Sequence, residues 1–452
     1  MRTLFEISRS GLLTAERSMS VTSQNLINAD TPGYSRQRVN TSPVGMQMPQ
    51  RHAGLGVNIT SISRLRNEMN EVMLNKSRQN MGYMQGKSKV LEQLEATMTT
   101  DSGGDLDLRI GRLFDVFSDL SSNPQDMSVR NNIISEATQL TAKLSELDRS
   151  IQRTSDLVRD SVGHSVTRVN HLLSDLAALN NAIKYGEATK NPDNTSLDIQ
   201  VQKLAELSEQ VDFDSQVTAN GTVEIRIGGV LVLHEDQVST IKTEIDEINK
   251  TYRLRLNNGK TLQVNGGKLG AELEMYQQVI PDNRKMLDEI AATLVEQFND
   301  LHFQGFGLDG TGGRAFFDPV NTTATSIQVN PDLVANQNLI AASSAADEPG
   351  SGDIAAQIAD LRNEKVVSGR KLIDYTVDLI SRPGSELSEL RNQIESADSE
   401  IHMLELQQEQ EAGVSIDEEL TLLIQYQNAY QGAARVMVAA QEMYDTLLSI
   451  TR

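Results

Sequence analysis

The sequence of 452 residues contains no cysteine and no tryptophan, and aromatic residues make up only 4% of it. The absence of cysteine excludes a disulfide framework, a thiol nucleophile and any metal or iron–sulfur site with thiolate ligands. Because apolar residues still make up 38% of the chain, Leu, Ile, Val, Ala and Met must build the core. Such a composition favours long helices packed side by side over an aromatic-rich sandwich or a globular enzyme.

Basic residues are also scarce, since 41 Lys and Arg stand against 62 Asp and Glu and give a formal net charge of −21. A phosphate backbone rewards positive charge, so this balance argues against a nucleic-acid partner. We find no apolar stretch that resembles a secretory signal peptide or that could span a membrane. Taken alone, these absences predict a cytosolic protein without membrane insertion, either a cysteine-free enzyme or an assembly protein.

The charge is unevenly distributed along the chain. Residues 1–90 contain 12 basic and 5 acidic side chains, whereas residues 401–452 contain 2 basic and 8 acidic side chains. Segments of opposite sign attract each other, or attract the opposite ends of neighbouring copies. The alternative is that both segments are solvated helix faces with a chance bias in charge.

Both ends of the chain show the apolar period of a supercoiled helix, in which contact positions follow each other at alternating spacings of three and four. The C-terminal contact positions are Leu423, Tyr426, Tyr430, Ala433, Met437, Ala440, Tyr444 and Leu447. The weaker N-terminal series is Phe5, Ser8, Leu12, Ala15, Met19, Thr22 and Leu26. We expect the two ends to pair with each other and then with other subunits. The alternative is that each helix docks on its own domain as part of an intramolecular core.

A turn ends the N-terminal helix. Thr31-Pro32-Gly33-Tyr34 has the composition of a type II turn, with Pro in the second position and Gly supplying the positive φ of the third. Proline also moves Thr31 out of the helical region, and Asp30 is expected to support the turn with a local hydrogen bond.

The middle of the chain is predicted to be strongly helical. One helix is expected from about residue 64 to 97, after an extended stretch at 35–62. A long seam with helical spacing then runs from Ile133 to Leu176, and two consecutive steps of four at its centre form a stutter that unwinds a supercoil locally. Another helix is expected at about 196–211.

A change of period then predicts a small β insertion, because Val223, Ile225 and Ile227 alternate and Gly- and Asn-containing turns bound the apolar runs. Helix returns at about 268–304, a loop rich in Gly, Asp and Asn follows, and helices fill 353–411 up to a break at Gly413. The patterns therefore predict a mainly α protein, a long helical bundle with paired N- and C-terminal coiled-coil helices and a small β-rich insertion. The predicted units are a terminal coiled-coil core (1–45 with 412–452), a helical bundle domain (46–212 with 265–304 and 353–411), the β insertion (213–264) and an outer loop region or reduced outer domain (305–352).

The turn and the far end of the chain carry a family resemblance. Residues 25–39 resemble the N-terminal signature of bacterial flagellar axial proteins, and the Tyr-Ser-Arg-Gln continuation resembles the hook-associated protein 1 (FlgK) family rather than rod or hook proteins. Residues 415–448 are similar to the C-terminus of that family, and stretches at 119–124, 270–273 and 298–302 also match. The signature residues are Asn25, Asn28, Asp30, Thr31, Pro32, Gly33, Tyr34, Ser35, Arg36 and Gln37.

The chain departs from the family pattern in three places. Ile27 stands where a small residue is usual and Asp30 where Asn is usual, and neither change disturbs the turn. The region 305–352 is short, although many relatives carry a β-rich outer domain there, so the surface roles of such a domain are in doubt.

The resemblance implies a structural adaptor that joins hook to filament and has no catalytic activity, cofactor or metal. It implies a ring of like subunits whose terminal helices form the tubular core, with the hook protein and a second hook–filament junction protein as neighbours. It further implies export in an unfolded state by the flagellar type III apparatus, with a chaperone at the C-terminal region, and an extracellular location in the flagellum. We also expect both terminal segments to be mobile in the free monomer.

The contact positions expected to mediate subunit assembly are Phe5, Leu12, Met19, Leu26, Leu423, Tyr426, Tyr430, Ala433, Met437, Ala440, Tyr444 and Leu447. Tyrosine supplies contact area and a hydroxyl, whereas small residues such as Ala433 and Ala440 allow helices to approach closely. A hook or rod axial subunit is the alternative function, and a flagellum-associated enzyme that cuts peptidoglycan is a rival from another class.

Two motifs could suggest chemistry, and both have a simpler interpretation. Residues 305–310 match G-x-G-x-x-G, but a dinucleotide site needs a strand before the motif and a helix after it, and here a helix is predicted before it. His164 and His171 lie seven residues apart on a predicted helix, but Arg168 between them opposes a cation, so a solvated face is the better interpretation. We therefore predict no active site.

Overall fold

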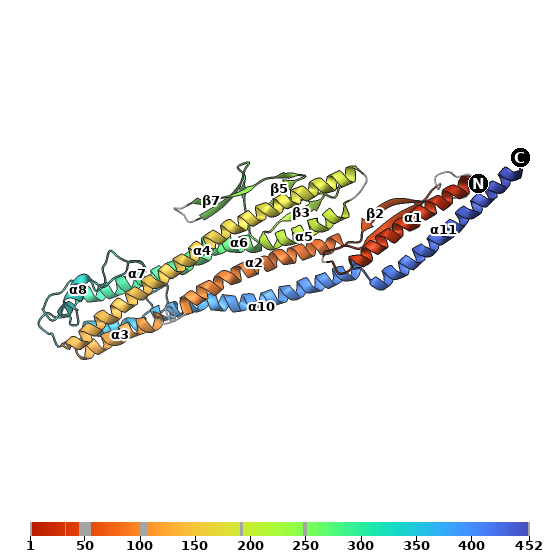
Figure 1. The fold of residues 1–452 in the computed structure, drawn as a ribbon. Helices are drawn as coiled ribbons and strands as arrows, with labels where there is room; N and C mark the ends of the chain where they lie inside the picture. The colour runs from red at the N-terminus through yellow and green to blue at the C-terminus, as the bar shows by residue number, and fades with distance from the viewer. Residues whose placement is uncertain are drawn as a thin grey trace.

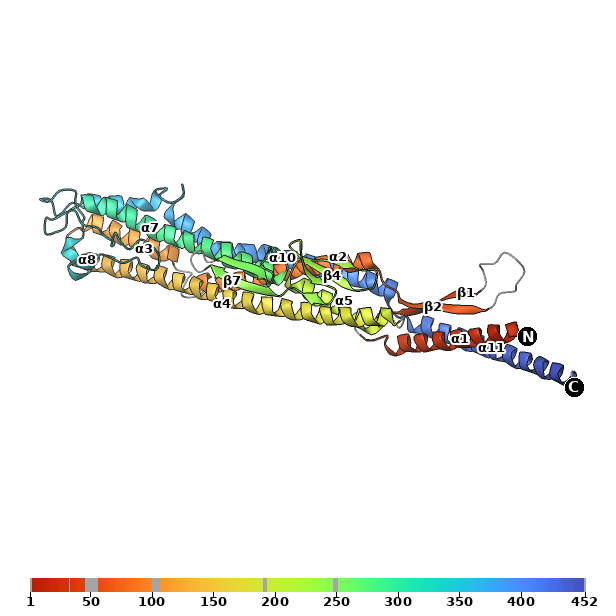
Figure 2. The same cartoon turned by 90° about the horizontal axis from the view of Figure 1, so that it is seen from above.

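The computed structural model describes residues 2–31, 33–44, 56–99, 106–189, 193–246 and 251–450. The molecule is elongated and mainly helical, with a small group of strands along one flank (Figure 1). Both chain termini lie at one end of the long axis, and the segment around α8 lies at the other (Figure 2). The predicted class, a long helical bundle with helices at both chain ends and a small β insertion, is confirmed.

The bundle contains the longest helix of the described chain. Its helices are α2 (Glu68–Thr99), α3 (Leu106–Ser122), α4 (Met127–Ala188), α5 (Asn194–Gln210), α6 (Gly267–Glu274), α7 (Ile280–Gln304), α9 (Asp353–Asp360) and α10 (Leu372–Ala412). A π-helical turn, Met275–Val279, joins α6 to α7. Every position of the seam predicted between Ile133 and Leu176 is buried, including Thr154, Val158 and Val162 at the stutter. The stutter therefore does not interrupt α4, which is a single helix of 62 residues.

The start of α2 lies later than the predicted position near residue 64. Asn67 caps the helix, because its side-chain oxygen accepts hydrogen bonds from the amides of Met69 (3.1 Å) and Asn70 (3.2 Å). The residues just before it are held in extended pairing, since the amide of Leu65 donates to the carbonyl of Arg36 (2.8 Å). A side-chain cap at Asn67 is therefore what fixes the helix start at Glu68.

The β insertion consists of two small antiparallel sheets, with strand orders β3-β4-β5-β6 and β7-β8-β9. Its strands are β3 (Asp214–Val217), β4 (Val223–Ile227), β5 (Val230–His234), β6 (Gln237–Val238), β7 (Ile241–Asp246), β8 (Thr251–Leu256) and β9 (Thr261–Leu262). The alternation of Val223, Ile225 and Ile227 is confirmed, since all three are fully buried. The strands β3, β6, β7 and β9 have no comparable apolar alternation and were not predicted individually.

Two asparagines of α4 attach this insertion to the bundle. The side-chain amide of Asn180 donates to the carbonyl of Val223 and accepts from its amide, both at 2.9 Å. Asn170 makes the same two bonds with Ile241, both at 2.8 Å. Each asparagine thus takes the place of a neighbouring strand residue, which satisfies backbone groups that would otherwise lack partners.

Residues 305–352, predicted as a loop region or reduced outer domain, have a mostly irregular backbone that packs against the bundle. The segment includes α8 (Pro331–Ala335) and a 3₁₀ turn (Gln337–Leu339), and it supplies core residues of its own. Its fully buried apolar side chains are Phe316, Phe317, Ala324, Leu333 and Ile340. Phe316 and Phe317 pack against Phe298 of α7, with ring centroids 5.8 and 5.6 Å apart. The mostly irregular backbone agrees with the predicted loop, whereas its buried core was not predicted, because that core has no regular spacing that a sequence could reveal.

A buried arginine and a buried histidine hold that segment against the helices. Arg130 is fully buried and has no carboxylate partner among the described residues, and its guanidinium donates to the carbonyls of Pro124 (2.7 and 2.9 Å) and Ile340 (2.6 Å). Burial lowers the pKa of Arg130 to about 10. His302 lies between the carbonyl of Arg314 (2.8 Å) and the amide of Ala341 (2.9 Å). Burial lowers the pKa of His302 to about 4, so its imidazole is neutral.

The prediction that helices fill 353–411 was wrong between α9 and α10. A 3₁₀ turn, Leu361–Asn363, follows α9, and Val367 and Arg370 then pair across a tight turn. Ser368 and Gly369 occupy the turn with φ of 46° and 73°, a left-handed conformation that a helix cannot accommodate.

At the terminal end, α1 (Arg2–Ile27) and α11 (Ile416–Ile450) lie side by side, next to an antiparallel hairpin of β1 (Gln37–Pro43) and β2 (Val57–Arg64) (Figures 1 and 2). The helix break expected at Gly413 is present, because α10 ends at Ala412 and α11 begins at Ile416. The domain division drawn from the sequence stays a prediction. No helix in the described ranges has the length and apolarity that crossing a membrane requires.

Candidate assembly site at the paired termini

The helices α1 and α11 run antiparallel and approach closely near their middles. A Cβ added to Gly11 would lie 3.3 Å from the Cβ of Ala433, so these two small residues let the helices approach closely at this point. In α1 the predicted positions Ser8, Ala15 and Thr22 are buried. The other predicted positions of α1, Phe5, Leu12, Met19 and Leu26, are half-buried. The N-terminal seam therefore lies on the covered side of α1, which packs against α11 and the β1–β2 hairpin.

The C-terminal seam is covered only in part. Ala440 is 1% exposed, and Leu423, Tyr426, Ala433 and Met437 are half-buried against α1. The remaining seam positions, Tyr430, Tyr444 and Leu447, are 40–49% exposed. Beyond Ala440 the described part of α11 extends past α1, and its side chains are exposed there. Intramolecular pairing thus buries the first part of the seam and leaves its last turns uncovered.

Several other large apolar side chains of α11, outside the predicted seam, are also exposed. These exposed residues are Ile416, Leu420, Ile424, Val436, Val438, Met443 and Leu448. On α1 the exposed large apolar residues are Leu4, Leu13 and Ile27. Exposed apolar side chains that gather on one helix pair are typical of a protein–protein contact.

Asn25 of the signature is the centre of a buried hydrogen-bond cluster at the base of the helix pair. Its side-chain nitrogen donates to the carbonyl of Gln37 (2.9 Å) and to the carboxylate of Glu419 (3.0 Å). Its side-chain oxygen accepts from the amide of Gln37 (3.0 Å) and from the hydroxyl of Tyr34 (2.9 Å). Asn25 is 1% exposed, so one satisfied amide joins α1, β1 and α11.

The turn positions Tyr34 for this contact. Gly33 has a φ of 79°, and the amide of Tyr34 donates to the carbonyl of Thr31 (3.1 Å), as a type II turn requires. The local side-chain bond comes from Asn28, which accepts from the hydroxyl of Thr31 (3.3 Å), and not from Asp30, which is exposed. Pro32 lies outside the described residues. Burial, with smaller effects from nearby carboxylates, raises the pKa of Tyr34 to about 12, so its phenol remains a donor.

Arg36 connects the basic beginning of the chain to its acidic end. Its guanidinium lies 2.8 Å from Glu418 and 2.8 Å from Glu419, and the Glu419 side chain is 1% exposed. Its amide donates to the carbonyl of Ala412, the last residue of α10 (3.4 Å). One signature residue therefore fixes the direction in which α11 leaves the bundle.

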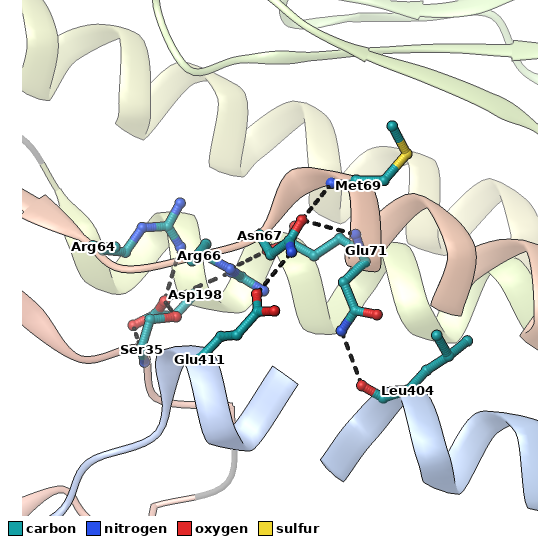
Figure 3. A network of polar contacts seen from close by, with 10 residues as sticks. Ser35, Arg64, Arg66, Asn67, Met69, Glu71, Asp198, Leu404 and Glu411 are labelled. Carbon is teal, nitrogen blue, oxygen red and sulfur yellow. Dashed lines mark hydrogen bonds and ion pairs between the residues drawn. The ribbon is translucent and has the colours of Figure 1, made fainter. Parts of the chain in front are cut away.

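A second polar cluster attaches the turn to the bundle through Asp198 of α5 (Figure 3). The carboxylate of Asp198 accepts from the hydroxyl of Ser35 (2.7 Å) and from the guanidinium of Arg64 (2.8 Å). Nearby, Arg66 forms an ion pair with Glu71, and burial lowers the pKa of Arg66 and raises that of Glu71. Next to this pair, Asn67 donates to Glu411 of α10 (2.7 Å) and Asn70 donates to the carbonyl of Leu404 (2.9 Å).

The structure therefore brings most of the signature residues together. It also gives them hydrogen-bond and ion-pair partners that were not predicted from the sequence. Asp198 and Arg64 are the clearest omissions, because each is a single charged residue in an otherwise ordinary segment. Gln37, which was predicted, also accepts from the side chain of Asn194 at the start of α5 (2.9 Å). Ile27 of the signature region is 81% exposed and contributes nothing to this cluster.

The described residues offer little for catalysis or metal binding. No group of three or more His, Asp and Glu side chains within the described ranges could hold a metal ion. His164 and His171 are exposed, and Arg168 between them pairs with Glu206 of α5. The glycine motif at 305–310 follows α7, and Phe306 pairs with Ser343, so no strand–turn–helix unit surrounds it. The paired helices α1 and α11 instead provide exposed apolar surface and ordered hydrogen bonds.

Comparisons with known proteins agree with this geometry. A family model described as flagellar hook-associated protein FlgK helical domain matches residues 91–317. A second model, flagellar basal body rod FlgEFG protein C-terminal, matches residues 409–450, which include nearly all of α11.

Full-length relatives are similar across the whole chain. Flagellar hook-associated protein 1 of Bacillus subtilis is 23% identical over 495 aligned residues, which cover 98% of this chain and 97% of the relative. The protein of the same name from Salmonella typhimurium is 22% identical over 555 aligned residues and is covered completely. The solved structure of the flagellar hook junction protein FlgK from Burkholderia pseudomallei superposes with a TM-score of 0.65 at 13% identity. That superposition covers 75% of this chain and 99% of the other, and it shows a shared fold.

Proposed function

The chain belongs to the family of the flagellar hook-associated protein FlgK, structural proteins of the hook–filament junction, and we propose that it joins hook to filament by polymerising through α1 and α11. Membership also makes it a component of the extracellular flagellum. The observation that carries the proposal is the terminal helix pair, whose first turns are closed by an intramolecular seam while a long apolar surface of α11 stays uncovered.

We assign different roles to the polar contacts at the base of the helix pair and to the exposed apolar side chains of α11. Intramolecular pairing, the Asn25 cluster and the Arg36 ion pairs hold α11 in a defined direction. The uncovered apolar side chains of α11 then provide the contacts with neighbouring copies, because buried apolar area is the main favourable term in association. A ring built this way needs the same two surfaces on every subunit, which suits a head-to-tail arrangement.

The finer partners and the route of export are also proposals. We infer that the neighbours along the axis are the hook protein and a second hook–filament junction protein. We further propose that the chain leaves the cell unfolded through the flagellar type III apparatus and that a chaperone covers its C-terminal region before export. The exposed apolar residues of α11 support the chaperone proposal, because they would otherwise cause aggregation in the cytoplasm.

Deletion of the gene tests the function directly. We expect hooks without filaments and flagellin released into the medium, and wild-type filaments in the deletion strain would contradict the proposal. Complementation with Leu447→Asp should fail to restore filaments, because a charge is placed on the uncovered seam. Gln441→Asp is the matched control, since it adds the same charge to an exposed polar position of the same helix and should restore them.

A further inference from the structure

The three Asn-Gly pairs of the sequence lie in or next to the β insertion, at 220–221, 258–259 and 265–266. An asparagine followed by glycine can lose its side-chain amide when the backbone nitrogen of the glycine attacks the side-chain carbonyl carbon. Glycine favours this attack because it has no Cβ to obstruct the approach and because its backbone rotates easily. In the folded chain, the contacts around each pair therefore determine which asparagine reacts.

The pair Asn258-Gly259 lies in the turn between β8 and β9. Both residues are exposed, Gly259 has a φ of 85°, and a Cβ added to Gly259 would meet nothing within 4 Å. The Oδ1 atom of Asn258 accepts a hydrogen bond from the amide of Lys260 (3.1 Å), which holds the carboxamide over the turn and draws electron density from the carbon to be attacked. The bond from the Gly259 amide to the carbonyl of Leu256 (2.8 Å), which the attack must break, lies within the same exposed turn.

The pair Asn220-Gly221 lies in the turn between β3 and β4, and its glycine is packed against the bundle. A Cβ added to Gly221 would lie 3.3 Å from the side chain of Ile183 in α4 and 3.5 Å from that of Leu197 in α5. The carbonyl of Gly221 also accepts from the side chain of Gln200 (3.4 Å). These contacts oppose the backbone rotation that the attack requires, so we expect Asn220 to react more slowly than Asn258.

The pair Asn265-Gly266 connects β9 to α6 and lies against Asp212. The amide of Asn265 donates to the carboxylate of Asp212 (3.2 Å), and a Cβ added to Gly266 would lie 2.9 Å from the Cβ of Asp212. The carbonyl of Gly266 accepts from the amide of Gly270 in α6 (3.2 Å). The attacking nitrogen must lose its proton, and a neighbouring carboxylate opposes the negative charge that forms. Backbone bonding and charge therefore both disfavour reaction at Asn265.

We propose that Asn258 is a modification site of the folded chain, at which spontaneous deamidation converts the asparagine to aspartate or isoaspartate. The nitrogen of Gly259 loses its proton to hydroxide and bonds to Cγ of Asn258, the bond from Cγ to the side-chain nitrogen breaks, and ammonia leaves. Water then opens the resulting succinimide at either of its carbonyls. Water is the only co-reactant, and nothing is oxidised or reduced. The site lies away from α1 and α11 and does not depend on the assembly role proposed above.

Peptide mapping by mass spectrometry measures the reaction at each pair separately. The folded full chain would be incubated at mildly alkaline pH in water enriched in heavy oxygen, so that each new carboxylate carries the label. We expect Asn258 to convert several times faster than Asn220 and Asn265. Equal rates at the three positions, or a faster rate at Asn220 or Asn265, would overturn the proposal.

The same chain unfolded in urea is the reference, because the three pairs there share one chemistry and have no fixed surroundings. Their rates should converge in urea, and a preference for Asn258 that is no larger in the folded chain would overturn the role of the fold. Asn258→Gln lengthens the side chain by one carbon and disfavours ring closure, so it should remove most of the isoaspartate formed by the folded chain. Asn257→Gln, at the exposed neighbouring position, is the matched control and should leave the isoaspartate yield unchanged. An unchanged yield in Asn258→Gln would contradict the assignment of the site.

Discussion

The side-chain nitrogen of Asn25 lies 3.0 Å from a carboxylate oxygen of Glu419, so one buried hydrogen bond joins residues 394 positions apart in the chain. Glu419 in turn receives the guanidinium of Arg36 at 2.8 Å. Because all three groups are at least half-buried and mutually satisfied, the cluster specifies how the two chain ends meet.

Removing Asn25 should loosen the terminal helix pair. Asn25→Ala leaves the hydroxyl of Tyr34, the amide of Gln37 and the carboxylate of Glu419 without this hydrogen-bond partner. Each of these groups that water cannot reach should lower the free energy of unfolding by about 1–3 kcal/mol. We expect faster hydrogen exchange across α1 and the first turns of α11 in the assembled protein. Asn28→Ala is the control, since Asn28 makes only exposed bonds, and equal exchange in the two variants would count against the cluster.

Gly33 should tolerate no other residue well. Gly33→Ala forces an L-residue to a φ of 79° and places its Cβ against the side chain of Gln202, so a loss of at least about 1 kcal/mol in unfolding free energy is expected. Gly163→Ala, in an open position of α4, should instead be neutral or stabilising by up to about 1 kcal/mol. Chemical denaturation of both variants compares them, and similar stabilities would show that the turn is not strained.

Asn180 should determine how firmly the β insertion is attached. Asn180→Ala removes the bonds to Val223 and to the carbonyl of Glu235 in a site that is 1% exposed. We expect limited proteolysis to cut residues 214–262 several times faster than in the wild-type chain. Asn181→Ala changes the exposed neighbouring residue and should be cut at the wild-type rate. Wild-type resistance in Asn180→Ala would mean that apolar packing alone holds the insertion.

Stability should fall in acid partly because of His302. Its pKa is lowered by burial to about 4, so between pH 6.5 and 4 the unfolded chain binds a proton that the folded chain does not. The contribution is fully present above pH 6.5 and is lost as pH falls towards 4, by about 3 kcal/mol in total. His302→Gln should flatten the pH dependence of the unfolding free energy in this range. An unchanged slope in His302→Gln would contradict the assignment.

The sequence predicted those parts of the fold whose packing is periodic. The seam from Ile133 to Leu176 is buried at every position because a single helix faces one continuous core. The seams at the two chain ends identified α1 and α11 as partners for the same reason. Their mobility in the free monomer and the assembly roles of their residues stay predictions.

The rest of the fold depends on contacts that produce no periodic pattern in the sequence. Phe316 and Phe317 build a core from irregular backbone, and a composition rich in Gly, Asp and Asn concealed it. Asp198 is one acidic residue on an amphipathic helix, and only the folded chain places it beside Ser35 and Arg64. The turn signature was visible, but its partners lie more than 150 residues away in sequence.

The central claim is that this chain is a structural subunit at the hook–filament junction that assembles through α1 and α11. The most direct test is electron cryo-microscopy of isolated hook–filament junctions carrying the wild-type chain. The account predicts density for the chain only in the zone between hook and filament, with α1 and α11 innermost and the apolar residues of α11 against neighbouring copies. Density along the hook or rod, or terminal helices that face solvent, would contradict it.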